Sequence, residues 1–484
     1  MRCTELASLE LPYTTIIRAE IVPPGGFVAQ ANSSTPGQPA PEYIGLPAFC
    51  RVVAIVSSVP DSEIEFELWM PEEGWNGNFV GIGDGGFAGA IFHSELAKPL
   101  ARGYAVANTD GGHKGGMADA TFAVGHPEKL IDHAWRAVHE MTVKSKVIVT
   151  TRYGRAARHS LWKGCSTGGR QALKEAQRFP EDYDAIAGGA PANNWVPLMS
   201  YALLVQQRLT DPNGAINPAG LALLKEAVIA ACDTKDGIAD RVINEPQTCE
   251  FDPGTLACTS GDVADCLAPH EIESARAIYA GVVHPDTGEV IFPGPEPGSE
   301  REWAYFTPDI FPIGENYFRD LVFNDREWDP HTFDFGADLA KATEREFAGL
   351  TSTDPDLSKF VERGGKLLLY HGWMDGLITP QNTINYYEAV VHTLGQEVVS
   401  DSVRLFMVPG MNHCSGGEGP SDIDILGVLE AWIESGTPPE RVLASKTLDD
   451  GTERTRPLCP YPQVVRYTGS GSPDDADSFE CTEP

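Results

Sequence analysis

The sequence predicts an α/β protein, because short apolar runs alternate with Gly- and Asp-rich loops and helical patterns. Between residues 50 and 110 the runs are CRVVAIVSSV, EIEFELWMP, NFVGIGDGGFAG and GYAVANTD. Apolar runs that end in such loops are typical of buried strands in a sheet covered by helices. The pattern returns at KLLLYHG (366–372) and VRLFMVPG (403–410). We therefore expect strands of an α/β core in both halves of the chain.

Helical patterns accompany these strands. Residues 129–149 and GGRQALKEAQRF, which ends before Pro180, have helical periodicity. Further helices are expected near 380–392 and, with an amphipathic pattern, near 424–435. SLWKGC (160–165) reads as a short strand, so strand, sharp turn and helix should surround Ser166.

The middle of the chain differs from both flanks. Residues 196–360 are rich in Pro, Asp and aromatic residues and show few clean strands. The chain of 484 residues exceeds the size at which single cores stop growing, roughly 250 to 300 residues. We therefore predict a core formed by 1–195 and 361–484, with 196–360 as an inserted domain.

The charge balance argues against some partners. The chain has 36 basic and 69 acidic residues, a formal net charge of −33. Such a charge repels nucleic acid and anionic membrane surfaces. The sequence also has no apolar run of the roughly 18 residues that a membrane span needs. We expect neither nucleic acid nor a membrane as a partner, and the sequence does not indicate an oligomeric state.

Ten cysteines favour a disulfide framework formed outside the cytosol, since none has the spacing of zinc ligands. The first segment, MRCTELASLELPYTT, has no continuous apolar stretch of the kind found in signal peptides. The expectation of a secreted or periplasmic protein therefore depends on the cysteines alone.

Residues Gly164–Gly168 match the pattern G-x-S-x-G, in which glycines allow a tight turn that exposes a serine hydroxyl. A serine needs a base to take its proton, and the base needs an acceptor for its other ring N–H. Asp375 and His413 follow strands in the order Ser, Asp, His that is found in α/β-hydrolases. Asp184, Asp422 and His371 are competing candidates.

Cysteines flank two of these residues, with Cys165 before Ser166 and Cys414 after His413. A disulfide holds its two Cα atoms about 4.4 to 6.8 Å apart. A single bridge between the two cysteines would bring the serine and the histidine within reach of each other. The alternative is a redox enzyme in which the two cysteines form an exchangeable pair.

An enzyme that transfers an acyl group through a serine also needs donors to the developing oxyanion. The residue after the nucleophile, Thr167, and the loop GDGGFAG with Gly85 and Gly86 are the candidates. The alternative for that loop is an ordinary glycine turn.

The segment CDTKDGIADRVINEP is a candidate calcium site. The carboxylates of Asp233, Asp236 and Asp240, with main-chain carbonyls of Ile238 and Val242, would form an oxygen cage that suits Ca²⁺. It is not an EF-hand, because Asn244 stands where the bidentate Glu would be. The alternative is a solvated acidic turn.

Three motifs stand out together: GCSTGGRQAL with AQRFPEDYDAIAGGAPA (164–192), HGWMDGLITP and PGMNHCSGG. They resemble the tannase and feruloyl esterase family of secreted serine esterases, which includes monohydroxyethyl terephthalate hydrolases. The resemblance covers nearly the whole chain. It implies an α/β-hydrolase core with a large inserted lid domain between the strands that carry Ser and Asp.

The resemblance also implies residue roles: Ser166 as nucleophile, His413 as general base and acid, and Asp375 as the residue that orients it. It implies a structural calcium ion in the lid, held by the five residues named above. The implied disulfides are Cys165–Cys414, Cys3–Cys50, Cys232–Cys249, Cys258–Cys266 and Cys459–Cys481.

The substrates that the resemblance implies are small esters of aromatic acids. The first expectation is a feruloyl or tannin ester, and the alternative is monohydroxyethyl terephthalate. The lid aromatics Trp303, Phe318 and Phe323 are candidates for a ring-binding wall, although plain core packing is the alternative for each. A non-catalytic binding protein with a hydrolase fold is the alternative from another class.

Overall fold

The computed structural model describes residues 1–28, 43, 45–211, 215–259 and 265–484. These residues form two compact units. The first comprises Met1–Asn193 and Glu346–Leu367, and the second comprises Asn194–Arg345 and Leu368–Pro484. The boundaries 1–195, 196–360 and 361–484 stay a prediction, since the lid segment and the C-terminal part fall into one unit.

The first unit contains seven strands in the order β1-β2-β3-β5-β4-β6-β7. Neighbours from β1 to β5 are antiparallel, and those from β5 through β4 and β6 to β7 are parallel. The strands are β1 (Thr14–Val22), β2 (Phe49–Val56), β3 (Ile64–Pro71), β4 (Phe79–Ile82), β5 (Ala105–Thr109), β6 (Ser160–Cys165) and β7 (Ala185–Gly189). Every residue of β4, β5 and β7 is buried, as the continuous apolar runs predict.

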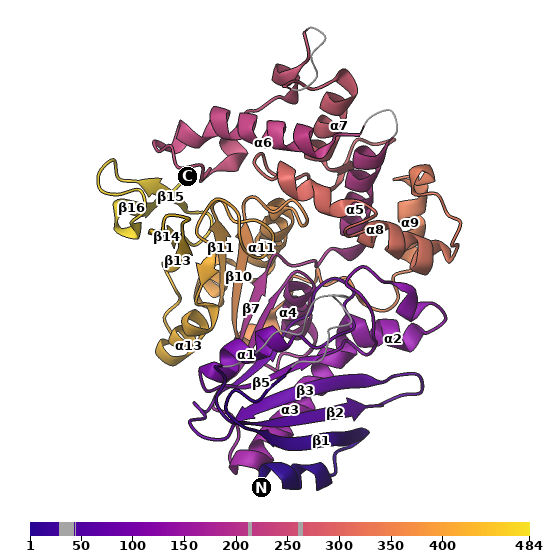
Figure 1. Cartoon of the computed structure of the whole chain (residues 1–484), viewed down its shortest axis with the longest axis vertical. Helices are drawn as coiled ribbons and strands as arrows, with labels where there is room; N and C mark the ends of the chain where they lie inside the picture. Colours follow the sequence, from indigo (N-terminus) through magenta and orange to yellow (C-terminus); the bar gives the residue numbers. More distant parts are fainter. Residues whose placement is uncertain (29–42, 44, 212–214, 260–264) are drawn as a thin grey trace. The chain divides into compact units, whose positions relative to one another are not determined.

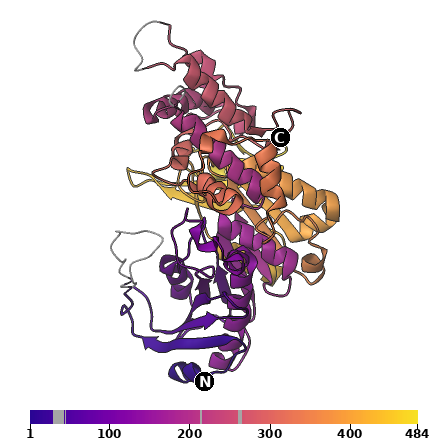
Figure 2. The same ribbon diagram turned by 90° about the vertical axis from the view of Figure 1, so that its right-hand side faces the viewer.

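Helices cover this sheet, and the small helix η1 lies beside β1 in both views (Figures 1 and 2). The helices are η1 (Cys3–Ser8), α1 (His93–Ala101), η2 (Thr121–Ala123), α2 (Pro127–Ile131), η3 (Asp132–Arg136), α3 (Ala137–Tyr153), α4 (Thr167–Arg178) and α10 (Ser358–Glu362). The helix expected over 129–149 is confirmed, although η3 interrupts it with a wider π turn. Helix α4 ends just before Pro180, as expected.

The second unit is mainly helical from residue 194 to residue 345. Helix α6 begins with a recognisable signal, because the Asn217 side chain accepts hydrogen bonds from the N–H groups of Ala219 and Gly220. The elements are α5 (Trp195–Thr210), α6 (Pro218–Cys232), η4 (Asp233–Asp236), η5 (Pro246–Thr248), η6 (Pro253–Leu256), α7 (Pro269–Ala280), β8 (Val282–Val283), β9 (Val290–Phe292), η7 (Glu300–Phe306), α8 (Ile313–Asn316), η8 (Tyr317–Phe323), η9 (Pro330–Thr332) and α9 (Ala337–Glu344).

Its C-terminal part returns to strands and helices. Strands β10 and β11 are neighbours in a sheet, and β12, β13 and β14 form a small antiparallel sheet. The elements are β10 (Lys366–Gly372), α11 (Pro380–Leu394), α12 (Gln396–Ser402), β11 (Val403–Val408), β12 (Asp422–Ile423), α13 (Ile425–Ser435), β13 (Val442–Thr447), β14 (Glu453–Leu458), β15 (Val464–Tyr467), η10 (Ala476–Ser478) and β16 (Phe479–Thr482). Helices α11 and α13 confirm the two helices expected there.

Disulfides tie the chain at several points. The structure pairs Cys3–Cys50, Cys232–Cys249, Cys258–Cys266 and Cys459–Cys481. Cys165 and Cys414 are also disulfide-bonded, and no cysteine is free among the described residues, which include all ten. The last bridge joins Cys459, directly after β14, to Cys481 in β16 and so fastens the C-terminal tail.

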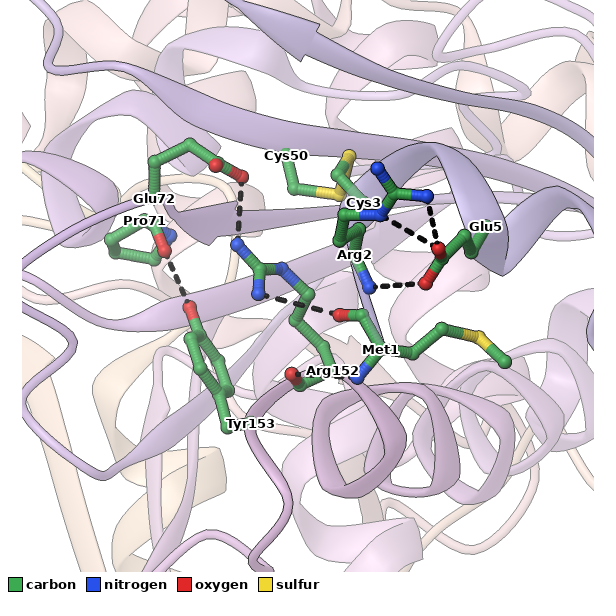
Figure 3. The surroundings of a disulfide bond; sticks show 9 residues. All are labelled: Met1, Arg2, Cys3, Glu5, Cys50, Pro71, Glu72, Arg152 and Tyr153. Carbon is green, nitrogen blue, oxygen red and sulfur yellow. Dashed lines mark hydrogen bonds and ion pairs between the residues drawn. A yellow bond between two sulfur atoms is a disulfide. The ribbon is translucent and has the colours of Figure 1, made fainter.

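The Cys3–Cys50 bridge fixes the first residues to the sheet (Figure 3). It joins η1 to β2, and helix α3 supports it because Arg152 donates to Glu72 over 3.0 Å while the Tyr153 hydroxyl donates to the Pro71 carbonyl over 2.8 Å.

In the ranges that the structure describes, no helix has both the length and the apolar character needed to cross a bilayer.

Candidate active site

Ser166 sits at a sharp turn between β6 and α4, where its φ is 62° and its ψ is −121°. A residue with a side chain avoids this region, at a typical cost of about 1 to 3 kcal/mol, unless its surroundings enforce it. Here the Ser166 N–H donates to the Gly189 carbonyl over 3.0 Å, and the Ser166 carbonyl accepts from Arg170 over 3.0 Å and from Ala192 over 3.1 Å. These hydrogen bonds hold the serine in the conformation that the strand, turn and helix pattern predicts.

The glycines of this turn are required by close main-chain contact. A Cβ on Gly164 would lie 2.4 Å from the Gly168 carbonyl oxygen. A Cβ on Gly168 would lie 3.0 Å from the Cα of Gly83, in the loop after β4. The turn and that loop can pack this tightly only because neither carries side chains at the contact.

The loop after β4 is hydrogen-bonded to α4. The Asp84 carbonyl accepts from the Gly168 N–H over 2.8 Å, and the Thr167 hydroxyl donates to the Gly86 carbonyl over 2.9 Å. The buried Asp84 carboxylate accepts from Gln171 and Asn108, and burial, opposed by these two hydrogen bonds, raises its pKa to about 7. Side-chain and main-chain contacts together fix this loop beside the serine.

Three main-chain donors remain available around Ser166. Within the part of the chain that the structure describes, the N–H groups of Thr167, Gly85 and Gly86 donate to no protein acceptor. Thr167 is the first residue of α4, so its N–H has no partner inside the helix, and the helix dipole adds partial positive charge there. Unpaired N–H groups at a helix start can receive negative charge that develops on an oxygen.

Asp375 and His413 form a hydrogen-bonded pair in the second unit. Asp375 lies in the loop after β10 and is fully buried, and its Oδ2 lies 2.8 Å from His413 Nδ1. Its Oδ1 accepts from the N–H groups of Leu377 and Ile378, each over 2.9 Å. Since Nδ1 faces a carboxylate, it carries the proton, and Nε2 is left as the basic nitrogen.

The pair perturbs its own protonation. Burial alone would raise the pKa of Asp375, but the charge of His413 and hydrogen bonds from His371 and His413 lower it well below its usual range. Burial alone would lower the pKa of His413, but the charge and hydrogen bond of Asp375 raise it above its usual value. Such mutual shifts are typical of an aspartate that orients a catalytic base.

The competing candidates lie elsewhere or act through Asp375. Asp184 accepts from the Ser160 N–H and pairs with Arg363, and Asp422 is exposed in β12. His371 is fully buried, with Nε2 3.1 Å from Asp375 Oδ2 and Nδ1 2.7 Å from the Thr383 hydroxyl. His371 is therefore a partner of Asp375 that sequence patterns offered only as a rival.

A second carboxylate close to the pair was not predicted. Glu302, in η7, accepts from the Gly376 N–H over 3.0 Å and from the His413 N–H over 3.1 Å. Burial and the charge of Asp375 raise the pKa of Glu302 to about 7. Glu302 is 111 residues from His413, and no motif in the sequence marks it.

The acidic segment after α6 keeps several oxygens without partners. Buried oxygens of Asp233, Asp236 and Asn244 have no hydrogen-bond partner in the described chain. Burial and the charge of Asp240 raise the pKa of Asp233, and they raise that of Asp236 to about 6. Asp240 accepts from the Val242 N–H and pairs with Arg456 over 2.6 Å. Unpaired buried carboxylate oxygens are suitable ligands for a hard cation.

In the acidic segment after α6, all of whose residues the structure describes, no three carboxylates have ligand atoms that lie within 4.8 Å of one another. Among the described residues, the one group of three His, Cys, Asp or Glu residues whose ligand atoms lie within 4.8 Å of one another is Cys3, Cys50 and Glu72, and both of those cysteines are disulfide-bonded. That group is therefore no metal site.

The lid aromatics pack against one another. Trp303 and Phe318 are fully buried, and the ring centroids of Phe318 and Phe333 lie 4.4 Å apart. Phe323 is only partly buried and contacts Trp328 at 4.9 Å. Of the three predicted aromatics, Phe323 alone is partly exposed, and the Lys341 ammonium lies 4.4 Å from its ring centroid.

Comparisons with known proteins agree on one family. The family model described as tannase and feruloyl esterase matches residues 50–482. An uncharacterised esterase of Xanthomonas campestris is 37% identical, with 99% of this chain and 91% of that protein covered. A protein of Aspergillus fumigatus with the name "Probable feruloyl esterase B-1" is 30% identical over 98% of this chain and 93% of its own.

The solved structures agree. The crystal structure of feruloyl esterase B from Aspergillus oryzae is 29% identical and covers 99% of each chain, with a TM-score of 0.90. The predicted fold, an α/β-hydrolase core with an inserted lid, is confirmed by this likeness. The chain belongs to the tannase and feruloyl esterase family and is an ester hydrolase.

Proposed function

We propose that this protein hydrolyses esters of aromatic acids with Ser166 as nucleophile, His413 as general base and acid, and Asp375 as the residue that orients the histidine. The single observation that carries the proposal is the 2.8 Å contact between buried Asp375 and His413 Nδ1, which leaves Nε2 as a base. The strained turn at Ser166 supports it, because such turns expose a serine hydroxyl. The relatives named feruloyl esterases support the choice of substrate.

The cysteines support the assembly of these residues. Cys165 and Cys414 are both disulfide-bonded, and the other eight cysteines pair among themselves. We propose that Cys165 and Cys414 bond to each other. A disulfide limits their Cα separation to about 4.4 to 6.8 Å, so it would hold Ser166 and His413 in one site.

In the proposed reaction, His413 Nε2 takes the proton of the Ser166 hydroxyl while the oxygen attacks the ester carbonyl. The tetrahedral intermediate places its negative charge near the N–H groups of Thr167, Gly85 and Gly86, which lack protein acceptors among the described residues. His413 then gives its proton to the leaving alcohol, and an acyl-enzyme forms. His413 then takes a proton from a water molecule, which attacks the acyl carbonyl. When the bond to Ser166 breaks, His413 returns this proton to the Ser166 oxygen, and the acid is released.

A side-by-side substrate assay tests the proposal. Methyl ferulate, methyl gallate, monohydroxyethyl terephthalate and methyl butyrate are offered to the wild type and to Ser166→Ala. We expect turnover of at least one aromatic ester, faster than that of methyl butyrate, and a loss of about 10³-fold or more in Ser166→Ala. Full activity of the variant excludes Ser166 as nucleophile, and an inactive wild type favours a non-catalytic binding protein.

Phe323 is the proposed ring contact of the acyl group, with Trp303 and Phe318 supporting the wall from inside the lid. This division follows from burial, since Trp303 and Phe318 are 0% exposed. Phe323→Leu should raise KM for the aromatic esters and leave that for methyl butyrate unchanged. An equal change for both substrate types would exclude an aromatic contact.

Calcium is the proposed structural ion of the lid. Asp233, Asp236 and Asp240, with the carbonyls of Ile238 and Val242, would hold it, and the unpaired buried oxygens of Asp233 and Asp236 fit that role. Bound there, the ion would neutralise the carboxylates and stiffen the segment after α6, without a part in ester chemistry.

We propose that the protein acts outside the cytosol, in a secreted or periplasmic location. Ten disulfide-bonded cysteines support this, because the cytosol keeps thiols reduced. Detection of the mature protein in the culture medium or periplasm of its source, and not in the cytosol, would test it.

A further inference from the structure

Glu302 connects the two loops that carry Asp375 and His413. Its carboxylate accepts from the Gly376 N–H, next to Asp375, over 3.0 Å and from the His413 N–H over 3.1 and 3.2 Å. The lid helix η7 supplies Glu302, whereas both loops follow strands of the core. One lid side chain therefore contacts the main chain beside both members of the catalytic pair.

We propose that Glu302 is a positioning residue of this esterase, which holds the Asp375 and His413 loops at a fixed spacing by accepting both N–H groups. The inference rests on the proposed function of the pair. Glu302 bonds to main-chain N–H groups and not to the His413 ring, so it does not replace Asp375 as the partner of Nδ1.

The contact between η7 and the Asp375 loop is close enough to require a glycine. A Cβ on Gly376 would lie 2.9 Å from the Glu302 Cβ and 3.1 Å from Cδ1 of Trp303. The Gly376 carbonyl in turn accepts from the Tyr201 hydroxyl over 3.0 Å. Lid side chains thus hold Gly376 at both its N–H and its carbonyl.

Helix η7 is itself held firmly, so Glu302 is presented on a rigid element. The Trp303 indole donates to the Ser299 hydroxyl over 3.2 Å. Glu300 accepts from the Gly298 N–H and from the Tyr279 hydroxyl, each over 2.6 Å. Glu302 is 7% exposed, so water has little access to its hydrogen bonds with the two N–H groups.

In this proposal Glu302 acts by accepting hydrogen bonds from the two N–H groups, and not through its negative charge. Oxygen Oε2 takes both the Gly376 and the His413 N–H groups. A glutamine with its carbonyl at this position keeps both contacts and loses the charge. Methionine has a similar length and no oxygen, so it leaves both N–H groups unpaired in a buried place.

The test compares Glu302→Gln and Glu302→Met with the wild type, Ser166→Ala and Glu300→Met. Glu300 is the matched control, because it is a buried glutamate of the same helix whose contacts stay within the lid. For each protein, kcat and KM for methyl ferulate, the pH profile of kcat/KM and the unfolding temperature are measured.

We expect Glu302→Met to lose about 10- to 100-fold in kcat with KM changed less than about threefold, because displacement of a catalytic group mainly affects the reacting geometry. Glu302→Gln should keep kcat within about threefold. Its acid limb should move slightly to lower pH, because Glu302 helps Asp375 to raise the pKa of His413 but, with its own pKa of about 7, is only partly charged in that range. Glu300→Met should lower the unfolding temperature and leave the acid limb in place.

A loss of more than tenfold in kcat in Glu302→Gln would overturn positioning by hydrogen bonds, and so would wild-type kcat in a folded Glu302→Met. If Glu302→Met does not fold, Glu302→Gln alone decides by the same limit. Retained activity in Ser166→Ala would instead refute the proposed function, which separates the two failures.

Discussion

The turn at Ser166 and the loops around His413 are held in their conformations by different physical means. Around Ser166 the geometry comes from missing side chains and main-chain hydrogen bonds, with Gly164 and Gly168 in direct contact. Around His413 it comes from buried, ionisable side chains, with Asp375 and Glu302 as hydrogen-bond acceptors. The first region should therefore respond to added volume, and the second to changes of charge and pH.

The largest effect is expected from Asp375→Asn. An amide at this position removes the negative charge and allows the wrong His413 tautomer, so kcat should fall by about 10⁴-fold with KM nearly unchanged. Steady-state kinetics with methyl ferulate measure this. Asp422→Asn, on the exposed rival aspartate, is the control and should leave kcat as it is. A loss in Asp375→Asn below tenfold would remove Asp375 from the catalytic site.

The Ser166 turn should break through volume alone. In Gly164→Ala the new Cβ meets the Gly168 main chain at 2.4 to 2.8 Å, which must displace the turn. We expect kcat to fall by about 10²-fold, and the free energy of unfolding to fall by about 1 to 3 kcal/mol.

Gly154→Ala is the matched control for this substitution. Gly154 has a φ of 73° at the end of α3, and no atom lies within 4 Å of its added Cβ. It should cost about 1 to 2 kcal/mol of stability from backbone strain and no activity. Kinetics and chemical unfolding of both variants measure the difference, and equal kcat values would contradict the close packing at Gly164.

The pH profile separates the two regions. In the proposed mechanism His413 must be neutral to accept a proton, and Asp375 raises its pKa. We therefore expect kcat/KM to fall about tenfold per pH unit below a limb that lies above about pH 6.5. Asp375→Asn should move this limb to lower pH. Gly164→Ala should lower the rate at every pH without moving the limb. A shifted limb in Gly164→Ala would show that the two regions do not act separately.

The sequence predicts the Ser166 region well because its signals are local. The glycines of GCSTG and GDGG, a strand before and a helix after are all read within a few residues, and the structure has them in that arrangement. Asp375 and His413 could be proposed from strand ends and chain order. Their hydrogen bond could not, since it depends on how distant loops are placed.

Glu302 and His371 show what sequence reading misses. Glu302 reaches its partners only through the packing of η7 on Gly376, across 74 residues of chain. His371 lies four residues before Asp375 and contacts its carboxylate. A spacing of four residues in a strand and the loop after it does not by itself predict such a contact. The lid aromatics show the reverse limit: composition marks them as a group, but the full burial of Phe318 and the partial exposure of Phe323 depend on tertiary packing.

The smallest effect on catalysis is expected from removal of calcium, which tests the acidic segment as a third region. If the ion binds the folded lid alone, it stabilises by RT ln(1 + [Ca²⁺]/Kd), or about 2.7 kcal/mol at a hundredfold excess over Kd. Chelation should therefore lower the unfolding temperature and leave kcat at 25 °C unchanged. Asp236→Asn should abolish the response to calcium, because it removes the charge of a half-buried carboxylate whose buried Oδ2 has no protein partner in the described chain. Asp252→Asn, on an exposed aspartate paired with Arg276, should keep the full response. The wild-type unfolding temperature could instead stay the same with chelator and with added calcium. The segment would then be an acidic turn held by Arg456, whose guanidinium lies 2.6 Å from Asp240.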